Sequence, residues 1–301
     1  MQMQAHHYNI RLISAPSILG LKPTGTELLA QTLLNGGLAE KLQVQQAVIQ
    51  VPVLNASYST QRHPVTNCIN TPALLDFSAL LGKTIQQVIS QHCFALTLGG
   101  DCSILLGIMP ALKARGTYSL VFMDAHADFY EPEKSLTGET ADMDLALITG
   151  RGPEMLTNIH QLRPYVKDEH VLHIGQRDWE ETQHYGSQDI QQTGIRCFDL
   201  AHIRQQGMDR VVTSVLQELN NMHTDGCWIH FDTDVLSDEI NPAVDYRIRG
   251  GLSFNEAGQL IQGVLSTGKA AGISVTIFNP LLDKDGTIAQ QIITMLAEAF
   301  S

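Results

Sequence analysis

Three short polar clusters in the sequence carry the residue types that bind divalent cations. In chain order they are Gly99-Gly100-Asp101-Cys102-Ser103, Asp124-Ala125-His126-Ala127-Asp128 and Asp232-Thr233-Asp234. Because alternate residues of an extended chain point the same way, the acidic and histidine side chains within each cluster can face one point. Several carboxylates gathered in a semi-buried cleft repel one another unless a cation compensates them. One histidine with four carboxylates suits Mn²⁺ better than a metal that prefers soft ligands.

Each cluster directly follows a stretch that is typical of a β-strand. The three predicted strands are residues 93–98, 118–123 and 226–231. In an open parallel sheet, ligands bind in the crevice at the carboxyl ends of the strands, so all three clusters should meet there. A lone Asp-x-Asp after a strand is more typical of a cap and turn. Two acidic motifs at strand ends of one chain favour a metal site.

Short β-branched or aromatic runs alternate with longer amphipathic segments along the chain. Further strands are predicted at residues 9–14, 47–54, 170–174, 195–198 and 271–278, and helices at 26–34, 73–92, 208–222, 253–265 and 287–300. This alternation is typical of βαβ units and predicts an α/β fold with a mainly parallel sheet covered on both faces. No linker-like or low-complexity segment divides the chain, so residues 1–301 are expected to form one domain.

The composition argues against several classes of function. The chain has 31 acidic and 19 basic side chains, a net charge of −12, whereas nucleic-acid and anionic-membrane surfaces rely on clustered Lys and Arg. No stretch approaches the roughly 18–20 apolar residues of a membrane span, and the polar N-terminus lacks the order of a secretory signal. Five scattered cysteines without a CxxC pair fit a reducing compartment. We therefore expect a cytoplasmic protein with a small-molecule substrate.

Taken together, the motifs resemble those of the ureohydrolase family of arginases, agmatinases and formiminoglutamases. That family has GGDHS, DAHxD and a DxD segment leading to GGL, and this chain has GGDCS, DAHADF and HFDTDVLSDEINPAVDYRIRGGLSF. The early APxxxG segment, HIGQRD and the late strand GISVTIFNP match as well, so the resemblance covers nearly the whole chain. It implies a three-layer α/β/α fold with a doubly wound sheet, and a homo-oligomer, either a trimer or a hexamer.

The resemblance also implies which residues hold the metal. Asp124 and Asp232 would bridge two manganese ions. Asp128 would belong to the first ion, and His126 and Asp234 to the second. Such a pair of ions activates a hydroxide, which would attack the planar carbon of a linear C–N bond in an amidine, guanidine or amide. Asp128 would then pass a proton to the leaving amine.

One departure from the family's pattern concerns the metal. Cys102 stands where GGDHS has the histidine ligand of the first ion. A thiolate is softer than imidazole and binds a metal only when deprotonated. Cys102 is therefore either a ligand, which would admit Zn²⁺ or Fe²⁺, or a small buried residue beside a single remaining ion.

Two further departures concern proton transfer and substrate binding. The family's SGNLHG loop carries a proton-shuttle histidine, but residues 137–143 contain none. Glu139 or Asp142 would then act as acid/base or bind the substrate's positive end; the alternative is that they are solvated loop acids. Ile277 stands where the family has the glutamate that binds a guanidinium or amidinium. Hydrogen bonds to charged groups contribute about 1.5–3 kcal/mol each, so this loss argues against ordinary arginase chemistry.

In the loop before GGL, Tyr246 and Arg247 are candidates to bind the substrate. The arginine would pair with a carboxylate of the substrate. Pairing of that arginine with surface acids is the alternative. The sequence as a whole favours a metal-dependent hydrolase of a linear C–N bond. Two other functions stay open at this point: a metal-dependent deacetylase, whose fold is related, and a non-catalytic descendant that binds a metal or metabolite.

Overall fold

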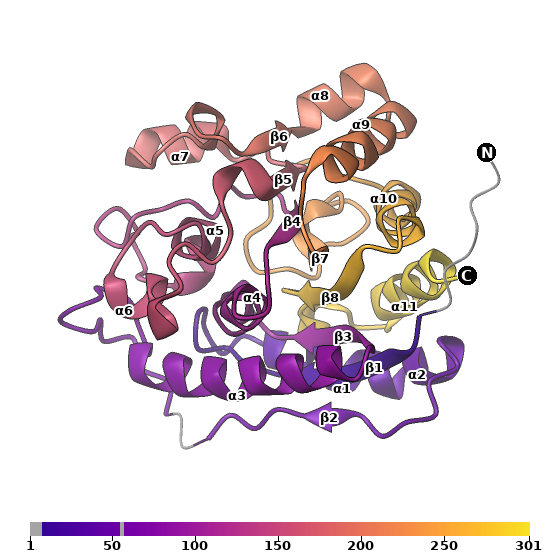
Figure 1. The fold of residues 1–301 in the computed structure, drawn as a ribbon, viewed down its shortest axis with the longest axis horizontal. Coiled ribbons are helices and arrows are strands. Elements are labelled where there is room, and N and C mark those ends of the chain that lie inside the picture. The colour runs from indigo at the N-terminus through magenta and orange to yellow at the C-terminus, as the bar shows by residue number, and fades with distance from the viewer. Residues whose placement is uncertain (1–7, 55–56) are drawn as a thin grey trace.

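The structure is a computed structural model that describes residues 8–54 and 57–301. In this part of the chain, eight strands form one sheet in the order β2-β1-β3-β8-β7-β4-β5-β6 (Figure 1). Every neighbouring pair is parallel. The strands are β1 (Ile10–Ala15), β2 (Ile49–Gln50), β3 (Phe94–Gly99), β4 (Tyr118–Met123), β5 (Val171–Ile174), β6 (Arg196–Phe198), β7 (Gly226–Asp232) and β8 (Ala270–Thr276).

Helices cover both faces of the sheet, which confirms the predicted three-layer α/β/α fold. In Figure 1, α4 and α5 lie to the left of the central strands, and α9, α10 and α11 lie to the right. No helix among the described residues is long and apolar enough to span a membrane. The helices are α1 (Leu29–Asn35), α2 (Leu38–Lys41), α3 (Thr71–Ser90), α4 (Leu105–Lys113), α5 (Asp144–Ile148), α6 (Glu154–Thr157), α7 (Trp179–Tyr185), α8 (Leu200–Gln206), α9 (Met208–Asn221), α10 (Phe254–Ser266) and α11 (Thr287–Ala299).

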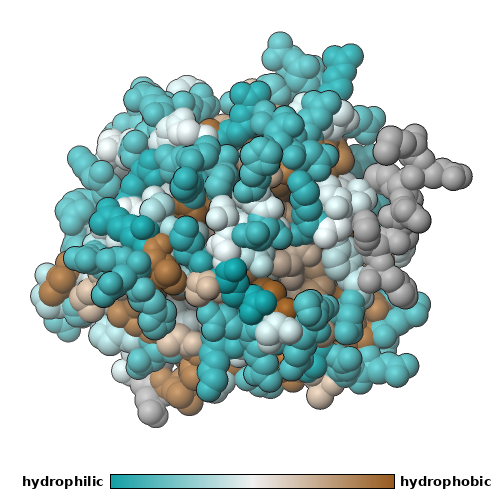
Figure 2. Space-filling view, in the orientation of Figure 1, coloured by the Kyte–Doolittle hydropathy of each residue, from teal (hydrophilic) through white to brown (hydrophobic). Residues whose placement is uncertain are grey.

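Two hydrophobic layers separate the sheet from its helices. Because successive strand residues point to opposite faces, Leu12 packs in the layer that contains α1, α9, α10 and α11, and Ile13 packs in the layer that contains α3, α4 and α5. Likewise, Ile229 packs in the first of these layers and Trp228 in the second. With both faces buried, the central strands read as almost continuous apolar runs. The outer face seen in Figure 2 is mainly hydrophilic, with apolar side chains in small separate patches.

The predicted elements differ from the observed ones mainly at their ends. Only Ile49–Gln50 of the predicted strand 47–54 pairs with the sheet, because β2 is an edge strand and Pro52 has no N–H for a ladder. The predicted helix 26–34 begins as a separate 3₁₀ turn at Thr26–Leu28. The helix predicted from residue 253 begins at Phe254, since Ser253 is its N-cap and accepts a hydrogen bond from the Glu256 amide at 3.2 Å.

The strand order explains why the three polar clusters meet. β3 and β4 follow one another along the chain, yet β8 and β7 lie between them in the sheet. A change of direction in strand order opens a crevice at the carboxyl ends of the strands. Cys102 follows β3, Asp124 follows β4 and Asp232 ends β7, so all three clusters reach this crevice, as the sequence predicts.

Candidate metal centre

The structure gathers the predicted ligands into one buried cluster with two ends. At what we call the His126 end, ligand atoms of Asp124, His126 and Asp234 lie within 4.8 Å of one another. At the Cys102 end, those of Cys102, Asp128 and Asp144 do the same. A third group links the ends through the residues Cys102, Asp124, His230 and Asp232.

The His126 end is an ion pair with well-placed hydrogen bonds. Nδ1 of His126 lies 2.9 Å from Oδ2 of Asp234 and 3.6 Å from Oδ1 of Asp124. Backbone amides of His126 and Ala125 donate to Asp124 at 2.7 Å and to Asp234 at 3.1 Å. Burial opposes the charged imidazole, but Asp234 and Asp124 together outweigh it and raise the pKa of His126 well above its usual value. Burial likewise opposes the charged Asp234, and His126 nonetheless holds the pKa of that carboxyl below its usual range.

The Cys102 end has acids and a thiol but no basic side chain. Sγ of Cys102 donates to Oδ2 of Asp232 at 2.8 Å and lies 3.1 Å from Oγ1 of Thr276. Burial and the nearby Asp232 raise the pKa of the Cys102 thiol well above its usual value. Burial, reinforced by Asp124, likewise raises the pKa of Asp128 and of Asp144 well above their usual range.

The donor set fits a divalent cation. Both carboxylate oxygens of Asp144 and Oδ2 of Asp124 are buried and make no hydrogen bond among the described residues. A buried carboxylate without a partner is costly, so the arrangement is favourable only when a positive charge compensates it. Oxygen ligands of this kind are those that Mn²⁺ and Mg²⁺ prefer.

Residues after β5 hold the cluster-bearing loops in place. Oδ2 of Asp178 accepts the Ala127 amide at 2.9 Å, and Nη2 of Arg177 donates to the Asp234 carbonyl at 2.7 Å. Asp128 adopts a φ of +46°, a left-handed conformation uncommon outside glycine. The HIGQRD motif therefore supports the second and third clusters through hydrogen bonds behind them.

A cleft of about 370 Å³ opens beside the cluster, a size typical of small-molecule sites. Its lining includes His126 and Asp128 together with the acidic pair Asp232 and Asp234. Eight carboxylates line it in all, against one lysine and one arginine. The cleft therefore attracts cations, both metal ions and positively charged substrates.

The predicted acid/base residues Glu139 and Asp142 both line this cleft. The Tyr246 hydroxyl donates to Oε2 of Glu139 at 2.8 Å and accepts from Nζ of Lys22 at 3.0 Å. Ser135 donates to Oδ2 of Asp142 at 2.7 Å, but burial dominates and raises the pKa of Asp142 to about 7. The structure thus places these two acids and Tyr246 on the cleft wall.

Arg247 also lines the cleft, but its guanidinium has a partner within the protein. Nη2 donates to the carbonyl of Asp238 at 3.0 Å and lies 3.4 Å from its carboxylate. Both side chains are partly exposed, so the pair is weak and a substrate carboxylate could compete for the arginine.

One side of the cleft is apolar. A small buried hydrophobic cluster consists of Leu21, Cys102, Ala141, Val244 and Ile277. Three of these residues line the cleft: Leu21, Ala141 and Ile277. We call this cluster the apolar wall. Ile277 adopts a φ of +72°, which is unusual for a β-branched residue. When residues 137–142 are aligned with the SGNLHG motif, Ala141 takes the place of its histidine.

Asp144 and His230 were not predicted as ligands. Asp144 is the first residue of α5 and follows no strand, so strand-end reasoning passes over it; the Asp-x-Asp spacing from Asp142 is the signal that could have found it. His230 lies two residues before Asp232 on β7 and so shares its face. Its Nδ1 is 2.9 Å from Oγ of Ser274, and its buried Nε2 has no hydrogen-bond partner among the described residues.

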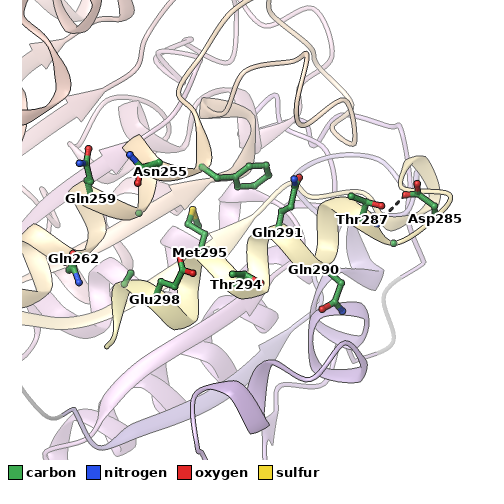
Figure 3. A pocket seen from close by; sticks show the side chains of 14 residues that line it. Asn255, Gln259, Gln262, Asp285, Thr287, Gln290, Gln291, Thr294, Met295 and Glu298 are labelled. Atoms are coloured by element: carbon green, nitrogen blue, oxygen red, sulfur yellow. Dashed lines mark hydrogen bonds between the residues drawn. The ribbon is translucent and has the colours of Figure 1, made fainter.

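Another cavity lies elsewhere and has a different character. This groove of about 610 Å³ runs between α10 and α11 and is lined mostly by amide and hydroxyl side chains such as Gln259, Gln291 and Thr294 (Figure 3). Asp285 and Glu298 are its only titratable lining residues. No candidate metal group of the described residues lies there, so the candidate metal ligands are confined to the acidic cluster and its cleft.

An eight-stranded parallel sheet with an acidic cluster at its carboxyl edge defines an α/β protein of the arginase fold. The sequence matches the family model described as "Arginase family" over residues 27–301. The chain belongs to the Arginase family, which confirms the resemblance found in the motifs.

Relatives and solved structures agree with this assignment. An arginase of Staphylococcus aureus (strain MSSA476) is 27% identical over 300 residues, covering 97% of this chain and 96% of the relative. An arginase of Bacillus caldovelox is 26% identical, covering 97% of each chain. The crystal structure of arginase from Bacillus cereus superposes with a TM-score of 0.85 at 24% identity, covering 98% of both chains. Formimidoylglutamase from Bacillus subtilis superposes with a TM-score of 0.73 at 18% identity, covering 97% and 86%. These superpositions show the shared fold.

Proposed function

We propose that this protein is a metal-dependent hydrolase that cleaves a linear C–N bond in an amidine, guanidine or amide. Members of the Arginase family are hydrolases that act on C–N bonds. The observation that carries the proposal is the convergence of five predicted ligands in one buried cluster beside the cleft, which all of them but Asp124 line. They are Asp124, His126, Asp128, Asp232 and Asp234.

Manganese is the proposed cofactor, as one or two ions, with Zn²⁺ or Fe²⁺ as alternatives if Cys102 is a ligand. Asp124 and Asp232 would be shared between the ends of the cluster, His126 and Asp234 would hold one ion, and Asp128 the other. Bound ions would supply Lewis-acid polarisation and water activation.

The chain's own residues would bind the substrate and move the proton. Asp128 lines the cleft beside the cluster and would carry a proton to the leaving amine. Glu139, fixed by the Tyr246 hydroxyl at 2.8 Å, and Asp142 would bind the positive end of the substrate or assist proton transfer. Arg247 would bind a substrate carboxylate after leaving Asp238.

The apolar wall supports a substrate other than arginine. A guanidinium placed against Ala141 and Ile277 would lose charge-assisted hydrogen bonds worth about 1.5–3 kcal/mol each. A neutral amide, or an amidine whose charge lies toward Glu139 and Asp142, fits the cleft better. Proton transfer would then depend on Asp128 and the loop acids, because residues 137–143 contain no histidine.

Turnover assays on metal-loaded protein test this function. Chelator-treated protein would be reloaded with Mn²⁺, Zn²⁺ or Fe²⁺ and incubated with arginine, agmatine, formimino compounds and simple amides. We expect release of urea, ammonia or formamide with Mn²⁺. Arginine turnover should be at least about 100-fold slower than that of the best substrate, which corresponds to about 2.7 kcal/mol of lost transition-state stabilisation. Release of acetate from an added N-acetylated amine, without turnover of the other compounds, would identify a deacetylase instead.

Protein that binds no metal and turns over none of these compounds would contradict the hydrolase. Metal binding without turnover would favour the non-catalytic descendant, for which the replaced shuttle and guanidinium positions are the supporting observations. Assembly into a homo-trimer or homo-hexamer, a cytoplasmic location and a single domain over residues 1–301 stay predictions. Light scattering of the purified protein measures the first of them.

A further inference from the structure

An aspartate outside the predicted ligand set lies inside the acidic cluster. The Asp144 side chain is completely buried, and one of its oxygens lies within 4.8 Å of ligand atoms of both Cys102 and Asp128. It reaches this place because α5 begins directly after the cleft loop, and Asp144 is its first residue. The residue therefore comes from an element that none of the three metal motifs includes.

Among the described residues, no hydrogen bond of ordinary geometry and no ion pair satisfies this carboxylate. Neither of its oxygens makes a hydrogen bond, and none of the ion pairs among the described residues includes it. The neighbouring Leu145 amide and the Asp128 carboxyl both favour the charged form of Asp144, but neither forms a hydrogen bond of ordinary geometry with it. A buried charge left in this way costs several kcal/mol unless a partner compensates it.

Two partners could compensate Asp144: a proton shared with Asp128, or a cation. A shared proton would satisfy only this pair of carboxyls. It would leave Oδ2 of Asp124, which is also buried and without a hydrogen bond, uncompensated. Because orphaned oxygens from two different elements lie in one cluster, a cation accounts for both.

We propose that Asp144 is a ligand of the metal ion at the Cys102 end. The inference rests on the proposed function in that it assumes a metal at this cluster. A carboxylate is a hard ligand of the kind that Mn²⁺ prefers, whereas the Cys102 sulfur is soft. Asp144 would thus replace the ligand that is missing at position 102, and the thiol would serve as the donor to Asp232 seen at 2.8 Å.

Metal counting on the purified full chain tests this assignment. Wild-type protein and the variants Asp144→Asn and Asp283→Asn would be stripped with chelator, dialysed against graded Mn²⁺ and analysed for bound metal. Asp283 is the matched control, a buried aspartate that accepts the Ile288 and Ala289 amides at 3.2 and 2.8 Å outside every metal group. We expect Asp144→Asn to bind one ion at least tenfold more weakly, and Asp283→Asn to bind manganese as the wild type does.

The stability of the metal-free protein gives a second readout. If Asp144 is an uncompensated ligand, Asp144→Asn leaves the metal-free protein as stable as wild type or more so, and reduces the stabilisation produced by Mn²⁺. A structural carboxylate would behave in the opposite way, and Asp283→Asn should show that pattern. An Asp144→Asn variant that does not fold would therefore contradict the proposal.

Unchanged Mn²⁺ number and affinity in Asp144→Asn would also overturn the assignment, and would identify the proton shared with Asp128 as the compensating charge. That result would not contradict the proposed hydrolase, because turnover measured on the same sample tests the hydrolase separately. Conversely, metal binding that depends on Asp144 in a protein without turnover supports the ligand and contradicts the hydrolase.

Discussion

The two ends of the acidic cluster compensate their buried charge in different ways. At the His126 end, one imidazole lies 2.9 Å from a carboxylate, and backbone amides satisfy further oxygens. At the Cys102 end, Asp128 and Asp144 have no basic neighbour, and the sulfur of Cys102 donates its single hydrogen bond to Asp232.

The two ends therefore differ in how far their structure depends on a bound ion. The His126 end is organised by the protein itself, so its geometry depends little on a bound ion. The Cys102 end is a set of acidic ligands that need a proton or a cation to compensate their charge, and we propose the cation. An ion should therefore contribute most to stability at the Cys102 end, and substitutions at the two ends should affect the metal-free protein with opposite signs.

The largest expected effect comes from Asp124, which belongs to the ligand group of the His126 end and to the group that links the two ends. Asp124→Asn should weaken both ions and lower kcat/KM on the best substrate by about 1,000-fold or more, since metal polarisation supplies several kcal/mol of transition-state stabilisation. Steady-state kinetics and metal analysis measure the two effects together. An Asp124→Asn protein that keeps one ion at full affinity would show that the two ends bind independently.

Removal of the metal should produce the next largest effect. Chelator-treated protein given Mn²⁺ at 100 times its dissociation constant should gain about 2.7 kcal/mol in its free energy of unfolding. For a chain of this size, that corresponds to a rise in Tm of roughly 4 °C in a thermal melt. Potassium chloride at equal ionic strength is the control. A gain of the same size in Asp144→Asn would place the stabilising ion at the His126 end and so contradict the comparison.

A smaller effect is expected when the self-compensated end is broken. Asp234→Asn removes the carboxylate that pairs with His126 and accepts the Ala125 amide. The metal-free protein should lose about 1–2 kcal/mol of stability, less than a fully buried pair would give, because the His126 side chain is 21% exposed. Urea unfolding in chelator measures this loss. Equal behaviour of Asp234→Asn and Asp144→Asn in that experiment would remove the distinction between the two ends.

The sequence predicted the His126 end better than the Cys102 end for a physical reason. Asp124, His126 and Asp234 leave strands whose residues alternate in direction, so spacing along the chain translates into position at the sheet edge. The order of the strands in the sheet was not predicted, because spacing along the chain does not determine which strands pair. The central strands were placed within a residue or two, since their apolar runs are long and buried on both faces.

Asp144 shows where this reasoning stops. It reaches the cluster through a loop and a five-residue helix, and no periodic pattern relates a loop's sequence to the direction in which its side chains point. The partner of Arg247 was equally beyond prediction, because Asp238 lies nine residues away on the same loop and only its fold brings the two together. The edge strand β2 was predicted too long, since an edge pairs on one side only and can end at any residue.

The smallest effect is expected at Cys102, the residue whose role the sequence left open. Cys102→Ser keeps a small donor within reach of Asp232 and Thr276, which lie 2.8 and 3.1 Å from the sulfur. If Asp144 is the ligand at this end, Mn²⁺ affinity should change by less than about threefold, which is under 1 kcal/mol. A thiolate ligand would favour Zn²⁺ over Mn²⁺, so its loss would lower Zn²⁺ affinity far more. Titrations of Mn²⁺ and Zn²⁺ against wild type and Cys102→Ser distinguish a hydrogen-bond donor from a metal ligand. If Cys102 is a donor, the ratio of the two affinities stays unchanged. A Zn²⁺ affinity lowered more than tenfold would identify Cys102 as a ligand.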